Sequence, residues 1–472
     1  MSASQGVVEK DATSSVWLND ALAHEGGGHV TPLDGSLRAD ICIVGGGYTG
    51  LWTALELKAR DPGLDIVVLE KDLCGSGGSG ANAGYALSIW LQFPLLARLY
   101  GTEEALRLCR ASDEDLSAIG SFSRDHDIDT QFDRQGAIWG ATCEAQSGHW
   151  EPMLESLERH QVHHFKRVDG DEIAAMTGTT AHVAGVLDQS AATIQPAMLA
   201  RGLRRVAIEQ GIRIFEKSPM IRLKRDSPPA VVTPRGTVTA DKVILALYAW
   251  SLGVRELRSS IMVICTDAAM TAPVPGALDD LGWRDGPALM DSRTFVEAYR
   301  TTRNGQVMWT KSGGAMPYGA RLDPCLKSIS RPLGFLRDVL RAPYPGLADQ
   351  TVAGTWAGPI DRTRDGLPMF GALAAAPDIL YGYGYSGAGI VFSKLGSRIL
   401  ASLALETDDA WSQGGLVRPV PGGFPPEPLR YVGAHMVRAA IARKDRFDHE
   451  GRDVGPITRG LLKFKPHSYK PT

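Results

Sequence analysis

The sequence predicts a chain of α/β plus α+β class, in which separated segments form one α/β unit and an antiparallel sheet forms a second unit. Residues 39–72 read as a strand, a glycine turn, a helix and a second strand. The apolar run VILAL at 243–247 is typical of a buried parallel strand. Residues 260–320 hold several short strand patterns separated by turns, which predicts an antiparallel meander.

The composition indicates a folded enzyme. The chain has 472 residues, of which 44% are hydrophobic and 22% are charged, so two or three domains with large cores are possible. The formal net charge of -3 provides no long-range attraction for phosphate polymers. We therefore expect no nucleic-acid partner.

The cysteine and histidine patterns indicate no metal site. The six cysteines are scattered without a C-x-x-C pair and are typical of reduced cytoplasmic thiols. His160, His163 and His164 lack a matching ligand set, so we interpret them as surface residues. No stretch approaches the roughly 18 apolar residues of a membrane span, and the first residues lack the apolar run of a secretory signal. These patterns predict a cytoplasmic protein.

Helical patterns occupy defined parts of the chain. A short amphipathic helix is expected at 15–24. Residues 92–180 are mainly helical, with the short strand GAIWGA between helices, and a further helix starts near Pro196. Residues 378–405 return to the order strand, glycine loop and helix. The α/β pattern thus occurs at both ends and in the middle of the chain.

A last helix follows the proline-rich stretch VRPVPGGFPPEP. One face of this helix is apolar, and basic side chains lie on the other. The apolar face comprises Leu429, Val432, Met436 and Ala440. Two interpretations stay open: a terminal helix docked on its own body, or a helix that binds a membrane surface or a partner.

The glycine turn near residue 45 has the pattern of a dinucleotide-binding site. Gly45, Gly47 and Gly50 form G-x-G-x-x-G between the first strand and its helix, and Thr49 lies within this motif. A pyrophosphate would lie over the helix N-terminus, whose free N–H groups favour an anion. Glu70 ends the second strand about 20 residues further on, where a carboxylate accepts hydrogen bonds from ribose hydroxyls. The whole unit predicts a Rossmann-like fold.

Nicotinamide and flavin dinucleotides share this motif, so the remaining sequence decides between them. The second strand leads into CGSGGSGANAGY and then into helices, rather than into the consecutive α/β units of a nicotinamide dehydrogenase. With its later motifs, the chain resembles the FAD-dependent D-amino-acid-oxidase-like superfamily, in the branch similar to γ-glutamylputrescine oxidase. The matching positions are Ser79, Gly80, Asn82 and Gly84; Trp356, Gly358, Thr363, Asp365, Pro368 and Gly371; and Gly384, Tyr385, Ser386, Gly387 and Gly389.

The resemblance implies an FAD site assembled from three segments. The first glycine motif and Glu70 would hold the adenosine half. Ser79, Asn82 and Gly84 would line the pyrophosphate and flavin side. The stretch Gly384 to Gly389 would close over the ribityl chain and the ring edge, through Gly384, Ser386, Gly387 and Gly389. The W-x-G loop GTWAGPIDRTRD contains no cysteine, which predicts noncovalent FAD.

The chain departs from relatives at three positions near the expected cofactor. Ala81 and Ala83 flank Asn82 where relatives often carry arginine and glycine, and Ala388 replaces a frequent histidine or asparagine. Each change removes or reshapes a group expected near the flavin. A shifted flavin potential or a roomier substrate cavity is the expected result.

Three basic residues are candidates for catalysis. The resemblance places Arg293 and Arg300 in the substrate domain, where a guanidinium could bind a substrate carboxylate or phosphonate in bidentate fashion. A framework ion pair with Asp291 or Glu297 is the alternative. Lys311 could place an ammonium beside the reduced flavin, which would favour reaction with O2, whereas a surface position is its alternative.

These patterns predict a discontinuous FAD-binding Rossmann-like domain with an antiparallel-sheet substrate domain. The expected segments are an N-terminal arm at 1–36, an FAD-binding domain at 37–90, 181–255 and 350–408, a substrate domain at 91–180 and 256–349, and a C-terminal helical extension at 409–472.

The expected activity is oxidation of an amine or amino acid to an imine, with O2 as the electron acceptor. An amine, an amino acid or an aminophosphonate would be the substrate. A dehydrogenase that uses a quinone or a carrier protein is one alternative. A flavin-binding subunit without catalytic activity is another, and a nicotinamide-dependent dehydrogenase is disfavoured by the later glycine motifs.

Overall fold

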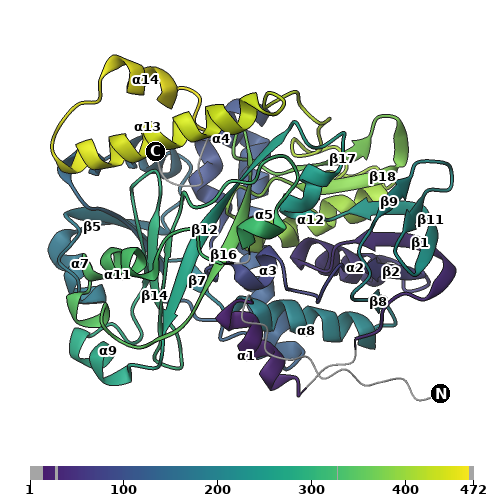
Figure 1. The fold of residues 1–472 in the computed structure, drawn as a ribbon, viewed down its shortest axis with the longest axis horizontal. Coiled ribbons are helices and arrows are strands. Elements are labelled where there is room, and N and C mark those ends of the chain that lie inside the picture. Colours follow the sequence, from purple (N-terminus) through teal and green to yellow (C-terminus); the bar gives the residue numbers. More distant parts are fainter. Residues whose placement is uncertain (1–13, 27–29, 327, 467–472) are drawn as a thin grey trace.

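The computed structural model describes residues 14–26, 30–326 and 328–466. Residues 1–13 of the predicted N-terminal arm, and residues 467–472 of the predicted extension, lie outside the described residues. Two large sheets organise the fold, one toward each end of the long axis in Figure 1. The predicted mixed α/β and α+β class is confirmed.

The first sheet contains the predicted βαβ unit. Its main strands follow the order β17-β18-β11-β1-β2-β8, and the β9–β10 hairpin attaches to β11. Strand β1 pairs in parallel with both β11 and β2, and β11 pairs in parallel with β18. The strands are β1 Gly35–Val44, β2 Ile66–Leu69, β8 Arg213–Phe215, β9 Arg222–Lys224, β10 Ala230–Val232, β11 Gly236–Leu245, β17 Met369–Leu373 and β18 Ala376–Tyr383.

Helices cover one face of this sheet. Alternate residues of β1 face opposite sides: Ile41 and Ile43 pack in a core shared with helix side chains, whereas Cys42 and Val44 pack with β10 and β11. The helices on the first side are α2 Tyr48–Arg60, α5 Thr102–Asp125, α8 Pro196–Glu209 and α12 Gly389–Ala404. Because β1, β2 and β11 are parallel, their carboxyl ends lie at one edge of the sheet. Parallel α/β folds bind ligands at this edge.

The second sheet contains the predicted meander. Its order is β16-β12-β15-β14-β13-β4-β6-β5, and β13, β14, β15 and β12 pair in antiparallel fashion. The strands are β4 Ala137–Ala141, β5 Phe165–Asp169, β6 Ala184–Asp188, β12 Ile261–Thr271, β13 Ala288–Asp291, β14 Glu297–Thr301, β15 Val307–Lys311 and β16 Val352–Thr363. A small pair, β3 Tyr85–Ala86 and β7 Ala192–Thr193, joins the two halves.

Two strands differ from the predicted domain segments. The sequence assigned β6 and β16 to the cofactor-binding segments 181–255 and 350–408, but both strands pair within the second sheet. Strand β16 matches β12 along nearly its whole length, and β6 lies between β4 and β5. Strand pairing is a long-range property, so proximity to a glycine motif in sequence did not reveal the partner.

The remaining helices surround these sheets. They are α1 Val16–His24, α3 Gly78–Ala81, α4 Phe93–Tyr100, α6 Glu151–Glu158, α7 Gly170–Thr177, α9 Pro275–Leu281, α10 Asp323–Leu326, α11 Leu333–Arg341, α13 Leu429–His449 and α14 Pro456–Leu462. Among the described residues, no helix is long and apolar enough to cross a membrane.

The N-terminal helix α1 is an integral part of the core. Trp17, Leu18 and Ala21 are buried against α8 and against strands of the second sheet, including Trp356 on β16. The Trp17 and Trp356 rings meet edge to face at 6.4 Å. The Ser15 side chain accepts from the Leu18 amide and starts the helix.

The C-terminal helix α13 docks on the body through a face that the apolar pattern did not predict. Leu429, Val432 and Met436 are at least half exposed, whereas Ile441 and Asp445 are buried. Figure 1 shows α13 and α14 along the upper edge of the molecule, at the end that holds the second sheet. The docked interpretation is therefore the observed one, with Leu429, Val432 and Met436 of the predicted apolar face exposed and Ala440 buried.

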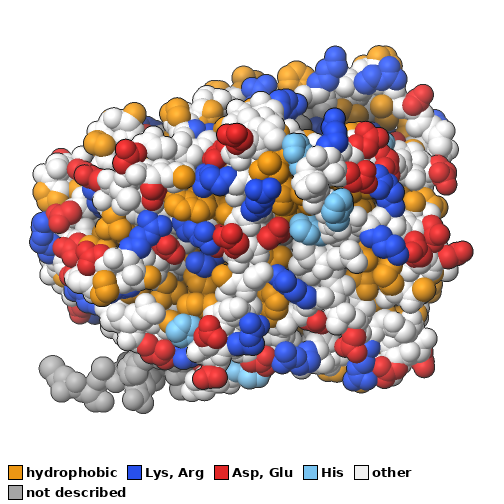
Figure 2. Space-filling view, turned by 180° about the vertical axis from the view of Figure 1, so that it is seen from behind, with side chains coloured by type: hydrophobic (Ala, Val, Ile, Leu, Met, Phe, Trp, Pro, Cys, Tyr) orange, Lys and Arg blue, Asp and Glu red, His pale blue; other side chains and the backbone are white. Residues whose placement is uncertain are grey.

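Charges of both signs are intermixed on the surface. Figure 2 shows Lys and Arg side chains beside Asp and Glu side chains across the face opposite to that of Figure 1. Such a face has no extended field of one sign, in keeping with the net charge of -3.

The packing of α1 gives a first prediction. We expect Trp17→Ala to lower the free energy of unfolding by about 3–5 kcal/mol, because a large buried side chain leaves a cavity. Trp17→Phe should cost less, since the indole N–H has no hydrogen-bond partner among the described residues. Urea unfolding of the three proteins measures both changes. Equal stability of the alanine variant and the parent would contradict the docking of α1.

Candidate active site

The turn between β1 and α2 brings backbone to the edge of the first sheet. Gly45 has φ +118°, and a Cβ there would lie 2.3 Å from the carbonyl oxygen of Ala246. A Cβ on Gly50 would lie 1.9 Å from the carbonyl oxygen of Gly45. Both positions therefore require glycine, and the turn can direct the α2 N-terminus toward a bound anion.

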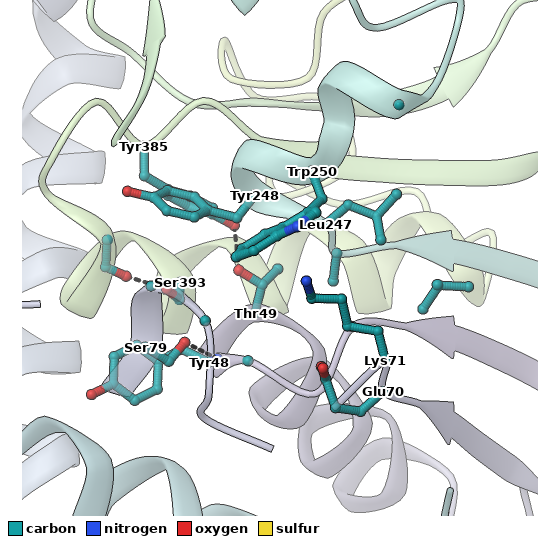
Figure 3. Close-up of a pocket in the computed structure, with 18 of the residues that line it drawn as sticks. Tyr48, Thr49, Glu70, Lys71, Ser79, Leu247, Tyr248, Trp250, Tyr385 and Ser393 are labelled. Carbon is teal, nitrogen blue, oxygen red and sulfur yellow. Dashed lines mark hydrogen bonds between the residues drawn. The ribbon is translucent and has the colours of Figure 1, made fainter. Parts of the chain in front are cut away.

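Glu70 ends β2 beside this turn. Its carboxylate accepts from the amides of Gly46 (2.8 Å) and Asp72 (2.9 Å). Burial raises the pKa of the Glu70 carboxyl, and the two amide bonds oppose that shift. The neighbouring Lys71 ammonium lies 4.4 Å from the Trp250 ring centroid. In Figure 3 Glu70 and Lys71 extend toward the same space below Trp250.

A cavity of about 600 Å³ runs from this edge of the sheet into the molecule. Glu70 and Lys71 line one end, and Tyr248 and Tyr385 line the other, as Figure 3 shows. The cavity wall includes eight of the predicted cofactor residues: Gly45, Gly47, Thr49, Glu70, Ser79, Asn82, Gly387 and Gly389. Gly50, Gly84, Gly384 and Ser386 do not line it.

The glycine-rich loop at 74–85 is ordered by its own side chains. Asn82 donates to the carbonyl oxygens of Gly78 (3.0 Å) and Ser79 (2.8 Å), and accepts from the Gly84 amide (2.8 Å). Ser79 Oγ accepts from the Tyr48 amide at 2.9 Å. Asn82 therefore holds the conformation of the loop, and Ser79 attaches the loop to the start of α2. Gly84 takes part in the hydrogen bonds of the loop and does not line the cavity.

The loop at 384–389 rests on a buried carboxyl group. Asp361 on β16 is fully buried and accepts from the amides of Gly384 (2.5 Å) and Ser386 (3.3 Å). Burial raises the pKa of the Asp361 carboxyl to about 8. Sequence reasoning missed Asp361, although it lies inside the quoted W-x-G loop; the available signal was an acidic side chain directly after the apolar residues Pro359 and Ile360.

A second cavity of about 190 Å³ adjoins the first. Both are lined by Asn82, Ala83, Tyr248 and Gly387. The second sheet contributes most of the remaining wall, which is mainly apolar. Its side chains there are Trp139, Thr266, Ala268, Met290, Val296, Ala298, Thr310, Ser312, Ile360 and Arg362.

Several polar groups of the second cavity are unsatisfied. Trp139 Nε1 and Thr266 Oγ1 have no hydrogen-bond partner among the described residues. The half-buried Arg362 forms no side-chain hydrogen bond or ion pair with the described residues. Desolvation lowers its pKa, while the neighbouring Tyr248 and Asp361 act in the opposite direction. A cation and two polar side chains are thus available to a ligand.

A family model described as DAO, FAD dependent oxidoreductase, matches residues 40–403. The chain belongs to this family. It is an FAD-dependent oxidoreductase, and the resemblance drawn from its motifs is confirmed. The C-terminal extension, from α13 onward, lies beyond the matched residues.

Relatives and solved structures agree with this family. The chain is 28% identical over 425 residues to the gamma-glutamylputrescine oxidoreductase of Escherichia coli K12, covering 88% of this chain and 94% of the relative. It is 25% identical to the glycine oxidase of Geobacillus kaustophilus over 79% of this chain and 95% of the relative. The crystal structure of glycine oxidase from that organism shares the fold, with a TM-score of 0.62, 21% identity and coverage of 81% and 100%.

The site fits the FAD of this family. A volume of about 600 Å³ suits a large cofactor, and the glycine turn leaves no side chain between the α2 N-terminus and the cavity. The three positions that depart from relatives all line the second cavity, where larger residues would occupy space. They are Ala81, Ala83 and Ala388.

None of the three predicted catalytic side chains of this oxidoreductase lines either cavity. Thr310 and Ser312 face the second cavity, so strand alternation turns Lys311 to the other face of the sheet. There its ammonium binds Glu297 Oε1 (2.8 Å) and the carbonyl oxygen of Phe295 (3.0 Å). Lys311 therefore has a framework position, and the sequence could not reveal which face it takes.

The two arginines also have framework positions. Arg293 pairs with Glu297 and lies 3.4 Å from Asp291, which is the alternative that the sequence left open. Arg300 is buried and donates to the carbonyl oxygens of Ala83, Gly84 and Ile194 at 2.7–3.2 Å. The cation that lines the second cavity is Arg362, which the motif comparison overlooked.

The raised pKa of Asp361 gives a prediction with a defined sign. The folded value of about 8 lies above the usual value of about 3.9, so the native state retains an extra proton between these limits. The contribution of this group to stability is full below about pH 4 and is lost as pH rises toward 8. Asp361→Asn cannot ionise, so its stability relative to the parent should increase with pH by at most about 1.4 kcal/mol per unit.

Urea unfolding of FAD-saturated Asp361→Asn and parent proteins across this pH range provides the measurement. Parallel stability curves for the two proteins would show that Asp361 does not titrate in this way.

The described residues contain no group of three or more histidine, cysteine or acidic side chains arranged to hold a metal ion. His164 instead lies 3.4 Å from Asp113, which raises the pKa of the imidazole.

Proposed function

We propose that this FAD-dependent oxidoreductase oxidises an amine that carries an anionic group, such as an amino acid, to the corresponding imine. The observation that carries the proposal is Arg362: a half-buried cation without a hydrogen-bonding or ion-pair partner among the described residues, in a small cavity that adjoins the cofactor-sized one. The similarity to a gamma-glutamylputrescine oxidoreductase and to a glycine oxidase supports the reaction class.

The large cavity would bind FAD through the predicted residues. Gly45, Gly47 and Thr49 form the start of α2, where the pyrophosphate would lie, and Glu70 would accept from the ribose. The two loops fixed by Asn82 and Asp361 would enclose the flavin end. No cysteine or histidine is among the described residues that line the two cavities, which supports noncovalent binding.

The second cavity would hold the substrate against this flavin end. Arg362 would bind a carboxylate or phosphonate with two parallel N–H bonds. Thr266 and Trp139 supply further polar contacts, and the side chains of Met290 and Ala298 form an apolar wall that excludes water. Bound FAD would accept one hydride equivalent, which is a proton with two electrons, from the α-carbon.

The same wall determines the protonation state of the substrate. Hydride transfer from the α-carbon needs the neutral amine, because its nitrogen lone pair stabilises the developing positive charge. No carboxylate, histidine or lysine is among the described residues that line the second cavity. Desolvation and the Arg362 charge would both disfavour an ammonium there, so the substrate would bind as the neutral amine without a dedicated general base.

The released electrons would pass to O2, giving hydrogen peroxide, while water hydrolyses the imine to a carbonyl compound and ammonia or an amine. A dehydrogenase with a quinone or a carrier protein as acceptor is the second candidate. One observation favours it: Lys311, the predicted ammonium beside the flavin, is turned away from the cavity.

Anaerobic titration tests the reaction. We expect the visible flavin absorption of the FAD-loaded protein to bleach when an amino acid or related amine is added, and to return in air. Bleaching that persists in air and reverses with a quinone would indicate the dehydrogenase. If no amine in a broad panel of amino acids, diamines and aminophosphonates bleaches the flavin, the proposed reaction is wrong, and a noncatalytic flavin-binding subunit remains.

The role of Arg362 gives a prediction about substrate binding. We expect Arg362→Met to lower kcat/KM for a carboxylate-bearing amine by about 10- to 100-fold, because a hydrogen-bonded charge pair is lost. The same amine without its carboxylate should be affected much less. Arg364→Met, at an exposed position on the same segment, is the matched control and should behave as the parent. An equal loss for both substrates would refute carboxylate binding by Arg362.

A further inference from the structure

Two neighbouring backbone segments form part of the wall of the second cavity. Val296 lies at the end of the turn between β13 and β14, and Ser312 follows β15; both line the cavity. The Ser312 amide donates to the Val296 carbonyl oxygen at 3.0 Å. These two segments are therefore hydrogen-bonded to each other, and both contribute to the wall of the cavity.

Helix α13 holds the first of these segments. The Asp445 carboxylate accepts from the amides of Thr294 (3.0 Å) and Phe295 (3.2 Å), immediately before Val296. The Lys311 ammonium holds the opposite side of the turn through the Phe295 carbonyl oxygen. Asp445 is buried, with a fractional exposure of 9%, so both amides depend on it for their hydrogen bonds.

The same helix face reaches the second segment. Arg438 Nε donates to the Gly313 carbonyl oxygen at 2.9 Å, next to Ser312. His449 Nε2 lies 2.7 Å from Arg293 Nη2 and 2.9 Å from Thr142 Oγ1. Residues 438, 445 and 449 are spaced by seven and four positions, which places them on one side of an α-helix. Two of these contacts, from Arg438 and Asp445, thus reach backbone next to residues that line the second cavity.

We propose that Asp445 is a positioning residue for the substrate: it fixes the turn that presents Val296 to the second cavity, and so makes the C-terminal extension a determinant of substrate specificity. The family match ends at residue 403, and α13 begins at 429, so this function lies outside the matched region. The inference rests on the proposed function only in taking the second cavity as the substrate site.

The test compares Asp445→Ala with Asp445→Glu, Asp445→Asn and the control Asp453→Ala, which removes an exposed acid of the same extension. For Asp445→Ala we expect KM to rise roughly tenfold with kcat within about threefold of the parent, because the turn loses two charge-assisted bonds. Selectivity should move toward substrates with larger side chains. Glutamate, which keeps the acceptors, should restore most of the KM, and asparagine should be intermediate.

Binding of benzoate gives a readout that does not require turnover. Benzoate carries a carboxylate and no oxidisable amine, and its dissociation constant can be followed through the visible spectrum of bound FAD. We expect this constant to rise roughly tenfold in Asp445→Ala, with unchanged affinity for FAD. The benzoate measurement remains informative even if the anaerobic titration shows that no amine is oxidised. Failure of the proposed function and failure of this inference are therefore distinguishable.

Three results would overturn the proposal. Asp445→Ala and Asp453→Ala could show the same KM and benzoate affinity. KM, kcat and FAD affinity could all decline together in Asp445→Ala, which would show a structural role alone. Glutamate could fail to restore what alanine removes, in which case the two amide bonds do not position the wall.

Discussion

The buried guanidinium of Arg300 joins the two halves of the site. It comes from β14 in the second sheet and donates to carbonyl oxygens of Ala83 and Gly84 in the glycine-rich loop, and of Ile194 beside it. The guanidinium carbon of Arg300 lies over the Trp17 ring, 5.2 Å from the ring centroid. Burial lowers the pKa of Arg300 to about 10, so the group stays cationic near neutral pH. The two cavities meet at this loop, and without the cation three carbonyl groups would lose a buried donor.

The cofactor half of the site was predictable because its requirements are local. Gly45 is required by its positive φ, Gly50 is required by a contact with the carbonyl oxygen of Gly45, and Glu70 follows a strand that the apolar pattern identifies. Ser79 and Asn82 were located through the family resemblance; Ser79 attaches the loop to the start of α2, and Asn82 bonds within the loop.

The substrate half depends on facts that no local pattern contains. The side of β15 that Lys311 occupies is determined by pairing with β12 and β14. Arg362 and Asp361 are adjacent, but alternation sends one to the cavity and the other to the loop at 384–386. The side of α13 that docks holds Arg438 and Asp445 beside the buried Ile441, so a search for apolar periodicity selected other residues of the helix.

The attachment of α13 separates two parts of the structure that can be varied. The residues that line the larger cavity belong to the matched family region, whereas one support of the second cavity comes from a helix beyond it. The Asp445 carboxylate contacts backbone beside the second cavity and not the glycine turn. Protein engineers can therefore treat α13 as a separate library for reshaping the second cavity.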